Sequence, residues 1–408
     1  MKCDSIFEKA SRVFPATQDP HTGLSTLYAV PLNQSDLPGV TGKGLWKTLY
    51  HQNHCFMAEG KQILLSYTEN PSDYRGGERS QYMLDLTTGE AFSPFPAGHW
   101  VTELSRSSPL ALMVRRTGAG GAVVCLWNIP DSRELAVFEL PDWTIWGGHF
   151  LADGQSAVLG SYRGKPYKEK CHSLHHLFRA DGTIKEVLNL DGCFCNHIQG
   201  CPADPGLYSY DRWPTPQRPC EVVNHLREVH GTFDIELPQI SGVKRPGSVW
   251  GGQRDHFLWT PDGHRIASYF SPLASDSTDH FDFGWWVSVM DWRTGEDLAA
   301  PYPADRWSGH FAVSPDSRLL VAIGRNSFQK VFAINIEKLR DGWNERVLCA
   351  CPPAVVRNDN CGPFHMPFFL PDQSGVIFTA GWSGGRQGVY IVELPDDMRK
   401  APLRTIES

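Results

Sequence analysis

Short apolar runs alternate with tight polar turns along almost the whole chain. Seven of these runs begin at or just after a histidine, and the clearest copies read HFLWTPDGHRIASYF, HFAVSPDSRLLVAIG and HMPFFLPDQSGVIFTAG. The seven histidines recur 45 to 59 residues apart: His54, His99, His149, His197, His256, His310 and His365. A repeat of this length, made of strands and tight turns, is typical of one four-stranded propeller blade. The pattern therefore predicts an all-β, seven-bladed β-propeller.

The last repeat predicts how the ring closes. After His365 only two further strand-like runs follow, GVIFTAG and GVYIVELP. We expect the missing outer strand to come from residues 23–31, GLSTLYAVP, since this pairing leaves no open edge in the ring. Because the repeats run almost end to end, we expect a single domain over residues 1–408.

Glycine-containing turns mark the outer hairpins. Thr87-Thr88-Gly89 and Arg293-Thr294-Gly295 end runs of strand-like residues, and glycine supplies the positive φ that a tight hairpin needs. The periodicity is strand-like nearly everywhere. Helix is expected only over about two turns at residues 4–11 and at 337–343.

The charge and hydropathy of the sequence indicate which classes of binding partner are not expected. The 408 residues carry a formal net charge of -7, spread without acidic or basic blocks. This distribution does not favour binding to nucleic acid or to an anionic membrane surface. The N-terminal residues lack the uninterrupted apolar segment of a secretory signal, and no stretch approaches the ~20 apolar residues of a membrane span. We therefore expect a cytoplasmic protein with no membrane partner.

Eleven cysteines are an odd number in a long chain without a signal sequence, which favours free thiols over disulfides. Cys193-x-Cys195-x-His197 admits a zinc site, but its spacing matches no standard finger or ribbon. Alternate cysteines on a strand share one face, so buried free thiols are the simpler interpretation. The further candidate ligands are Cys171, His172, His175, His176, Cys201 and Cys220.

The repeated histidines carry the first chemical hypothesis. If each opens the innermost strand of its blade, the imidazoles converge at one channel mouth, where they can bind a metal or move protons. Taken singly, a histidine at a strand start more often bonds only to a neighbouring backbone group. The three clearest copies, His256, His310 and His365, belong to consecutive blades and are the candidates for one shared site.

Arginine and aromatic side chains supply candidate substrate contacts. An arginine holds a carboxylate through two parallel hydrogen bonds. Four of them lie between or beside His197 and His256: Arg212, Arg218, Arg227 and Arg254. Aromatic rings near the histidines can stack on sugars, although most such rings pack in cores. These are Trp146, Tyr210, Trp213, Trp250, Trp259 and Trp307.

One apparent motif is excluded. Residues 381–385, GWSGG, fit the G-x-S-x-G pattern of a hydrolase nucleophile. That motif requires a strand-to-helix turn and a later histidine, and no histidine follows His365. The segment is therefore interpreted as a turn between two strands.

The histidine segments resemble oligogalacturonate lyase, the seven-bladed propeller family of polysaccharide lyases. The resemblance begins at Asp19-Pro20-His21-Thr22-Gly23, similar to the family's Asp-Pro-Asp-Thr-Gly opening. It continues through HFLWTPDG from His256, similar to the family's His-Glu-Phe-Trp-Ile-Pro-Asp-Gly, and through GVIFTAGW near the C-terminus. It covers nearly the full chain in patches, and the histidine placements are its specific part.

The resemblance implies roles for particular residues. His256 corresponds to the catalytic base, Arg218 to the arginine that binds the substrate carboxylate, and His310 to a manganese-binding histidine. His365 falls within one position of the family's His-Pro-His metal segment, so one metal histidine is missing here. The family's metal-binding glutamine has no clear match, and Asn358 or Asn360 is the nearest candidate. Manganese or another divalent cation is the implied cofactor.

The residue types also fit β-elimination. A lyase of this kind removes the C5 proton of a uronic acid and expels the O4 substituent. A cation or arginine must neutralise the carboxylate, and a neutral imidazole serves as base. His256 is the expected base, Tyr210 or His197 the further proton donor, and Arg212, Arg254 and Trp213 additional substrate contacts. The expected substrate is an anionic oligosaccharide, an oligogalacturonide from pectin.

Two alternatives remain open from the sequence. In a related propeller lyase for rhamnose-glucuronate or ulvan-type linkages, no metal is catalytic. His149 and either His172 or His176 then carry the reaction together with Tyr210 and Arg218. The other alternative is a non-catalytic platform for protein partners, although the repeats lack the Gly-His and Trp-Asp pairs of common scaffold propellers.

Overall fold

The structure is a computed structural model that describes most of the chain. The described residues are 4–19, 25–30, 37, 40, 45–50, 52–57, 59–68, 79–117, 120–165, 171–213, 222–237, 253–271, 286–303, 310–324, 329–351, 366–382 and 386–399.

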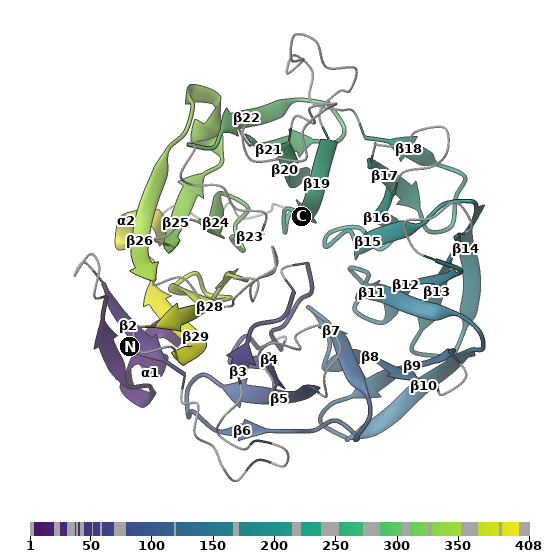
Figure 1. Cartoon of the computed structure of the whole chain (residues 1–408), viewed down its shortest axis with the longest axis horizontal. Helices are drawn as coiled ribbons and strands as arrows, with labels where there is room; N and C mark the ends of the chain where they lie inside the picture. Colours follow the sequence, from purple (N-terminus) through teal and green to yellow (C-terminus); the bar gives the residue numbers. More distant parts are fainter. Residues whose placement is uncertain are drawn as a thin grey trace. The chain divides into compact units, whose positions relative to one another are not determined.

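The chain forms seven antiparallel sheets and is a seven-bladed β-propeller, as the repeats predicted (Figure 1). Six sheets have four strands, and the seventh has five. The chain divides into two compact units. The first comprises residues 1–51, 59–93 and 305–408, and the second residues 52–58 and 94–304. A single domain over residues 1–408 stays a prediction.

The second unit holds four sheets, each with its strands in sequence order from one edge to the other. The first is β7 (Trp100–Leu104), β8 (Leu110–Arg116), β9 (Ala122–Asn128) and β10 (Arg133–Leu140). The next is β11 (Thr144–Phe150), β12 (Ser156–Arg163), β13 (His172–Arg179) and β14 (Ile184–Asp191). The third is β15 (Cys195–Gly200), β16 (Leu207–Arg212), β17 (Val223–Glu228) and β18 (Asp234–Glu236). The fourth is β19 (Gln253–Trp259), β20 (Arg265–Ser271), β21 (Trp286–Asp291) and β22 (Asp297–Pro301).

The first unit holds the other three sheets. One is β3 (Leu45–Lys47), β4 (Gln62–Thr68), β5 (Arg79–Asp85) and β6 (Ala91–Phe92). Another is β23 (Phe311–Val313), β24 (Leu319–Ile323), β25 (Gln329–Asn335) and β26 (Glu345–Cys351). The five-stranded sheet joins β1 (Ala16–Gln18), β2 (Thr26–Ala29), β29 (Arg386–Glu393), β28 (Gly375–Trp382) and β27 (Phe368–Phe369), in that order.

The middle strands are apolar on both faces because each packs between neighbouring sheets. In β9, AVVCLWN, all residues but the last are buried, whereas the outer strand β10, RELAVFEL, alternates buried and exposed positions. In the second unit, Leu112 and Leu126 of one sheet share a core cluster with Leu159 of the next. Burial of this kind supplies the main stabilisation of the sheets.

The predicted hairpin chemistry is confirmed at the outer turns. The Asp85 carboxylate accepts hydrogen bonds from the backbone N–H groups of Thr87 (2.7 Å) and Thr88 (3.1 Å), and Gly89 adopts φ 77°. Asp291 and Gly295, with φ 74°, form the same arrangement between β21 and β22. Both turns place glycine where a side chain would be strained.

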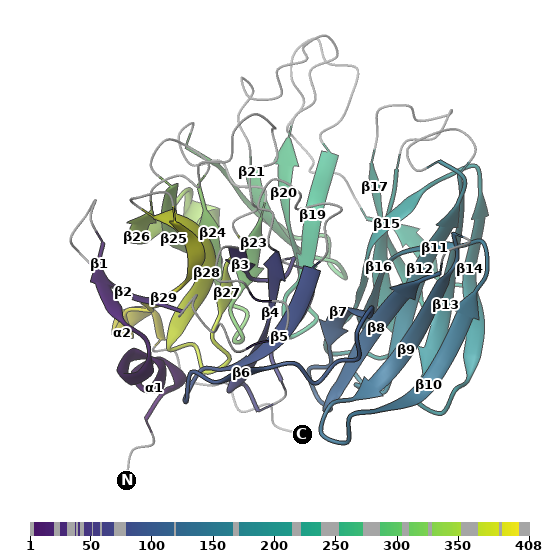
Figure 2. The same ribbon diagram turned by 60° about the horizontal axis from the view of Figure 1, so that its bottom comes forward.

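The N-terminal strand completes the last sheet as predicted. β2 pairs antiparallel with β29, and Leu27 lies opposite Val392. Figure 2 shows β2 between β1 and β29. The additional edge strand β1, paired to β2, was not predicted.

The helical segments are short. Helix α1 (Ile6–Val13) and the 3-10 turn η1 (Glu337–Asp341) confirm the two predicted sites, while α2 (Asp396–Arg399) was not expected. None of the helices in the described ranges is long and apolar enough to cross a membrane.

Helix α1 is anchored to the turn between β27 and β28. Ser5 and Glu8 form a capping box, so each side chain satisfies a backbone N–H of the first turn. The remaining N–H groups reach across the fold: that of Ile6 donates to Asp372 (2.6 Å) and that of Phe7 to Ser374 (2.9 Å). One turn of the last blade therefore caps the helix that precedes the closing strand.

We expect Asp372→Ala to lower the free energy of unfolding by about 1–3 kcal/mol, because it removes the acceptor of the Ile6 N–H and of the turn itself. Urea denaturation measures the change. The matched control is Asp181→Ala, since the Asp181 carboxylate accepts from Thr183 within its own hairpin. A loss no larger than that of the control would show that the helix anchor contributes little.

Candidate active site

Two of the repeated histidines occupy equivalent and unusual backbone positions. His197 on β15 and His256 on β19 have φ 45° and 49°. Each lies where the pairing register of its strand shifts, between Asn196 and Gln199 in β15 and between Asp255 and Leu258 in β19. Among the described residues, six other than glycine have positive φ, and only these two lie inside strands. Left-handed backbone at such a residue costs roughly 1–3 kcal/mol and is concentrated at functional sites.

Two glutamine side chains hold the bulge at His256. The carbonyl oxygen of Phe257 accepts hydrogen bonds from Gln199 Nε2 (2.6 Å) and Gln52 Nε2 (2.9 Å). Both amides are buried. A carbonyl released from the strand ladder by the bulge is therefore satisfied by side chains.

A buried carboxylate orients His197. Its Nδ1 lies 2.5 Å from Asp211 Oδ2, and the side chain of Asp211 is 0% exposed. The other carboxylate oxygen accepts from the Asn224 amide. Asp211 is on β16 and Asn224 on β17, so three strands of one sheet supply the chain of contacts. This arrangement favours a proton on Nδ1.

His197 and His256 contact each other. Their ring centroids are 5.1 Å apart, and His256 also stacks on Tyr269 at 5.0 Å with an interplanar angle of 24°. The contact brings two imidazoles from neighbouring sheets side by side.

His149 is paired with a different buried carboxylate, that of Glu103. Its Nδ1 lies 3.0 Å from Glu103 Oε1, and both side chains are buried. Glu103 on β7 also accepts from the backbone N–H groups of Phe150 (2.6 Å) and His54 (3.1 Å). Burial lowers the pKa of His54, and the charge of Arg106 lowers it further.

The histidines do not all occupy the predicted position. His149, His197 and His256 lie within innermost strands, and His99 and His310 directly precede β7 and β23. His54 follows β3 and lies before β4, so the prediction that it opens an innermost strand is wrong. The prediction that His99 meets the other histidines at one channel mouth is also wrong. Its side chain lies beside Cys125 on β9 and Glu134 on β10. It therefore does not converge with the others.

An exposed aromatic lies on the same strand as His149. Trp146 is 45% exposed, the highest value but one among the large apolar side chains of the described ranges. Its ring meets Phe194 edge-on at 5.2 Å, and Tyr162 braces the same phenyl ring from a second direction at 5.2 Å. A tryptophan held rigidly with an open side suits stacking on a sugar ring.

Arg212 is the last residue of β16, beside Cys193, and Trp213 follows it. The backbone N–H of Trp213 donates to the carbonyl of Phe194 (2.9 Å). The Sγ atoms of Cys193 and Cys195 lie 3.9 Å apart, and this contact together with the charge of Arg212 lowers the pKa of Cys193. Both cysteines are buried and form no disulfide, as expected. No described group of three potential metal ligands includes them.

Tyr210 lies away from His197. It precedes Asp211 on β16, and consecutive strand residues point to opposite faces. Its hydroxyl donates to Asp234 (3.0 Å), and its ring stacks on His225 at 5.0 Å. Burial and the charge of Asp234 raise its pKa. The geometry therefore assigns Tyr210 to a buried polar network and not to the histidine pair.

That network accounts for Arg227 as well. Arg227 Nη1 lies 2.8 Å from Asp234 Oδ2, and its Nε donates to the carbonyl of Val187 (3.0 Å). His175 on β13 packs edge-on against Tyr210 at 5.1 Å. Burial and the charge of Arg227 lower the pKa of His175 to about 3. The charged guanidinium is thus used inside the fold.

The predicted manganese ligands are only partly described. His310 is buried, and its ring meets Tyr50 edge-on at 5.7 Å. His365, Asn358 and Asn360 lie outside the described residues, as do Arg218, Trp250, Trp307 and the side chain of Arg254. His310 belongs to no described group of three metal donors. The described residues therefore do not assemble the manganese site that the resemblance implied.

No protein-family model and no curated protein matches the sequence. Among solved structures, an oligogalacturonate lyase in complex with manganese superposes with a TM-score of 0.71 at 18% identity, covering 95% of this chain and 98% of that one. An oligogalacturonate lyase from Vibrio parahaemolyticus superposes with a TM-score of 0.70 at 16% identity, covering 94% and 97%. The chain has the fold of oligogalacturonate lyases. The distant resemblance seen in the sequence is confirmed at the level of the fold.

Several residues of the site were not found from the sequence. Asp211, Glu103, Gln52 and Gln199 are buried polar side chains that hold the histidines or their backbone. The available signal was the polar residues that interrupt apolar strands, as Asp211 does in LYSYDR. Their partners lie on other strands, so the pairings follow from sheet register and not from spacing.

We expect His175→Gln to make the protein less sensitive to acid. The unfolded histidine binds a proton near pH 6.5, whereas the folded one does so only near pH 3. Between these values the unfolded state holds more protons, so stability falls by up to about 1.4 kcal/mol per pH unit as the pH drops. Thermal unfolding at several pH values from 7 to 4.5 measures the slope, with the exposed His230→Gln as control. Equal slopes in wild type and His175→Gln would contradict the assignment.

Proposed function

We propose that the chain is a β-eliminating lyase of uronate-containing oligosaccharides, with oligogalacturonides as the expected substrates. The observation that carries the proposal is the contact between His197 and His256, both held in left-handed backbone at matching bulges. Beta-elimination needs a base and an acid within reach of one sugar unit. The pair supplies both.

His256 acts as the base and His197 as the acid. The neutral imidazole of His256 takes the C5 proton, and the electrons of the C5–H bond form the C4–C5 double bond. The C4–O4 bond breaks, and the departing O4 receives the proton of His197. The Asp211 carboxylate favours the protonated form of His197 before this transfer.

The substrate carboxylate must be neutralised for the C5 proton to leave. Arg218 is the arginine proposed for this role, with Arg254 as a further candidate. Arg212 alternates with Asp211 on β16 and contacts Cys193, so it fits this role less well. Trp146 and Trp213 are the proposed stacking surfaces for neighbouring sugar units. The proposed partner is therefore an anionic oligosaccharide, and the proposed compartment is the cytoplasm.

A divalent cation remains part of the proposal. One structure of similar fold is an oligogalacturonate lyase in complex with manganese. Manganese held by His310, His365 and Asn360 would polarise the substrate carboxylate when bound. Of these three residues only His310 is described by the structure. The proton transfers proposed above therefore use His256, His197 and Asp211 and do not require the cation.

A second candidate function has its own observation. The buried pair of His149 and Glu103 is also a carboxylate-oriented imidazole. In a lyase for rhamnose-glucuronate or ulvan-type linkages, His149 is the proposed base. The partners expected from the sequence fit less well, because His172 and His176 lie on β13 and Tyr210 in the buried network.

The deciding experiment follows the ultraviolet absorbance of a 4,5-unsaturated product with di- and trigalacturonate. Wild-type protein is assayed directly, after EDTA, and after EDTA followed by manganese. We expect absorbance to grow, and His256→Ala to lower the rate by about 10²–10⁴-fold. If EDTA abolishes the rise in absorbance and manganese restores it, the cation site is supported. If absorbance rises regardless of EDTA, catalysis by histidine and arginine alone is favoured.

His149→Ala is the matched variant. If it abolishes turnover of glucuronate-containing oligosaccharides while His256→Ala does not, the second candidate function replaces the first. If neither class of substrate gives absorbance with wild-type protein, the lyase proposal fails and the binding platform becomes the better explanation.

Asp211→Asn tests the orientation of His197. We expect kcat to fall by about 10- to 1,000-fold, because the amide no longer stabilises the positive charge on His197. The alkaline limb of the pH profile of kcat/KM should also move to lower pH. Asp204→Asn, in a surface turn of the same sheet, is the control. A lower rate with an unshifted pH profile would mean that Asp211 is structural only.

A further inference from the structure

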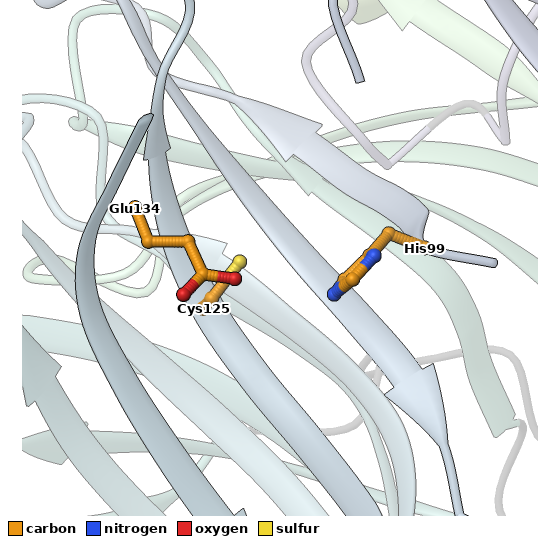
Figure 3. Close-up of side chains that lie close together, drawn as sticks. All are labelled: His99, Cys125 and Glu134. Atoms are coloured by element: carbon orange, nitrogen blue, oxygen red, sulfur yellow. The ribbon is translucent and has the colours of Figure 1, made fainter. Parts of the chain in front are cut away.

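Three potential metal ligands gather in the first sheet of the second unit, apart from the histidine pair. His99 directly precedes β7, Cys125 is on β9 and Glu134 begins β10. Their ligand atoms all lie within 4.8 Å of one another, and no other group of three His, Cys, Asp or Glu residues in the described ranges does so. Figure 3 shows the imidazole directed toward the thiol and the carboxylate.

We propose that His99, Cys125 and Glu134 form a zinc site. Imidazole nitrogen, thiolate sulfur and carboxylate oxygen are the donors that zinc takes in proteins. A thiolate and a carboxylate together cancel the two positive charges of the ion. The thiolate favours zinc over manganese, magnesium or calcium, which take oxygen donors.

The local structure positions each donor. His99 Nδ1 lies 3.3 Å from the carbonyl oxygen of Ala97, a contact that leaves Nε2 available to the ion. A hydrogen bond from the second ring nitrogen to a carbonyl is a common feature of zinc-bound histidines. Trp127 Nε1 donates to the carbonyl of Pro94 (3.1 Å), which ties the segment that leads to His99 onto β9.

The three side chains differ in solvent exposure. Cys125 is 1% exposed, His99 is half-buried and Glu134 is exposed. Burial and the charge of Glu134 raise the pKa of Cys125 to about 12, while Arg115 opposes this shift. Zinc binding would displace the proton of the thiol. Three protein donors would leave one of the four zinc positions to solvent or an external ligand.

Only a small adjustment is required. Bond lengths of about 2.0–2.3 Å place the ligand atoms of a tetrahedral zinc about 3.3–3.7 Å apart. The ligand atoms of His99, Cys125 and Glu134 now lie within 4.8 Å of one another. Side-chain rotations that shorten these distances by about 1 Å would therefore give zinc geometry. Glu134, being exposed, is free of packing constraints on such a rotation.

The site would join the two edges of one sheet. The backbone of His99 enters β7, while Glu134 belongs to β10 at the other edge. β7 also carries Glu103, which holds His149 and the backbone of His54. Zinc would thus fasten the strand that supports one of the buried carboxylates.

Cobalt(II) is the test probe, because a cobalt–thiolate bond gives a charge-transfer absorption band that oxygen and nitrogen ligands do not. We expect wild-type protein to bind one more equivalent of cobalt than Cys125→Ser, with the thiolate band lost in the variant and displaced by zinc in the wild type. His99→Ala and Glu134→Gln should each weaken zinc binding at least tenfold by calorimetry. Cys201→Ser, at a buried free cysteine directly after β15, is the matched control.

Thermal unfolding gives a second readout. Zinc should raise the Tm of wild-type protein and of Cys201→Ser, but not that of Cys125→Ser. Identical cobalt spectra and zinc responses in wild type and Cys125→Ser would overturn the proposal. Because these measurements involve no sugar, their outcome is independent of the lyase assay.

Discussion

Burial of each sheet on both faces is the constraint on which the rest of the structure depends. Middle strands such as β9 and β12 are buried over all but their last one or two residues. A polar side chain inside such an arrangement must find a partner, since an unpaired buried charge is costly. Asp211 and Glu103 are both buried, and each is paired with an imidazole and at least one further donor. The chemistry of the inner strands follows from this requirement.

Beta-bulges give the inner strands their functional geometry. At His197 and His256 an extra residue shifts the register and turns the side chain away from the face that strict alternation would assign. The cost of the left-handed backbone is offset by side-chain hydrogen bonds, including the two glutamine amides on the Phe257 carbonyl. Two histidines from different sheets can then make contact, which flat strands would not provide.

The histidine repeat serves several different purposes. His197 and His256 contact each other and form the proposed proton-transfer pair, His149 is bound to Glu103, and His99 belongs to a proposed metal site with sulfur and carboxylate donors. The buried network of Tyr210, His225 and Asp234 is a fourth kind of environment, which stabilises the interior of one sheet. Similar spacing in the chain therefore gives these histidines related but not identical places in the repeat, and the neighbouring side chains decide the chemistry of each one.

The sequence by itself determined the fold and much of its local detail. Strand periodicity, the repeat length, the hairpins at Gly89 and Gly295 and the closure of the last sheet by residues near Leu27 all follow from short-range patterns. Asp211 lies 14 residues from His197, and Glu103 lies 46 residues from His149. Such pairings depend on cross-strand register, on bulges that break the two-residue alternation, and on packing between sheets. Only the tertiary structure could decide them, because no local pattern encodes which of many polar residues will meet in a common buried space.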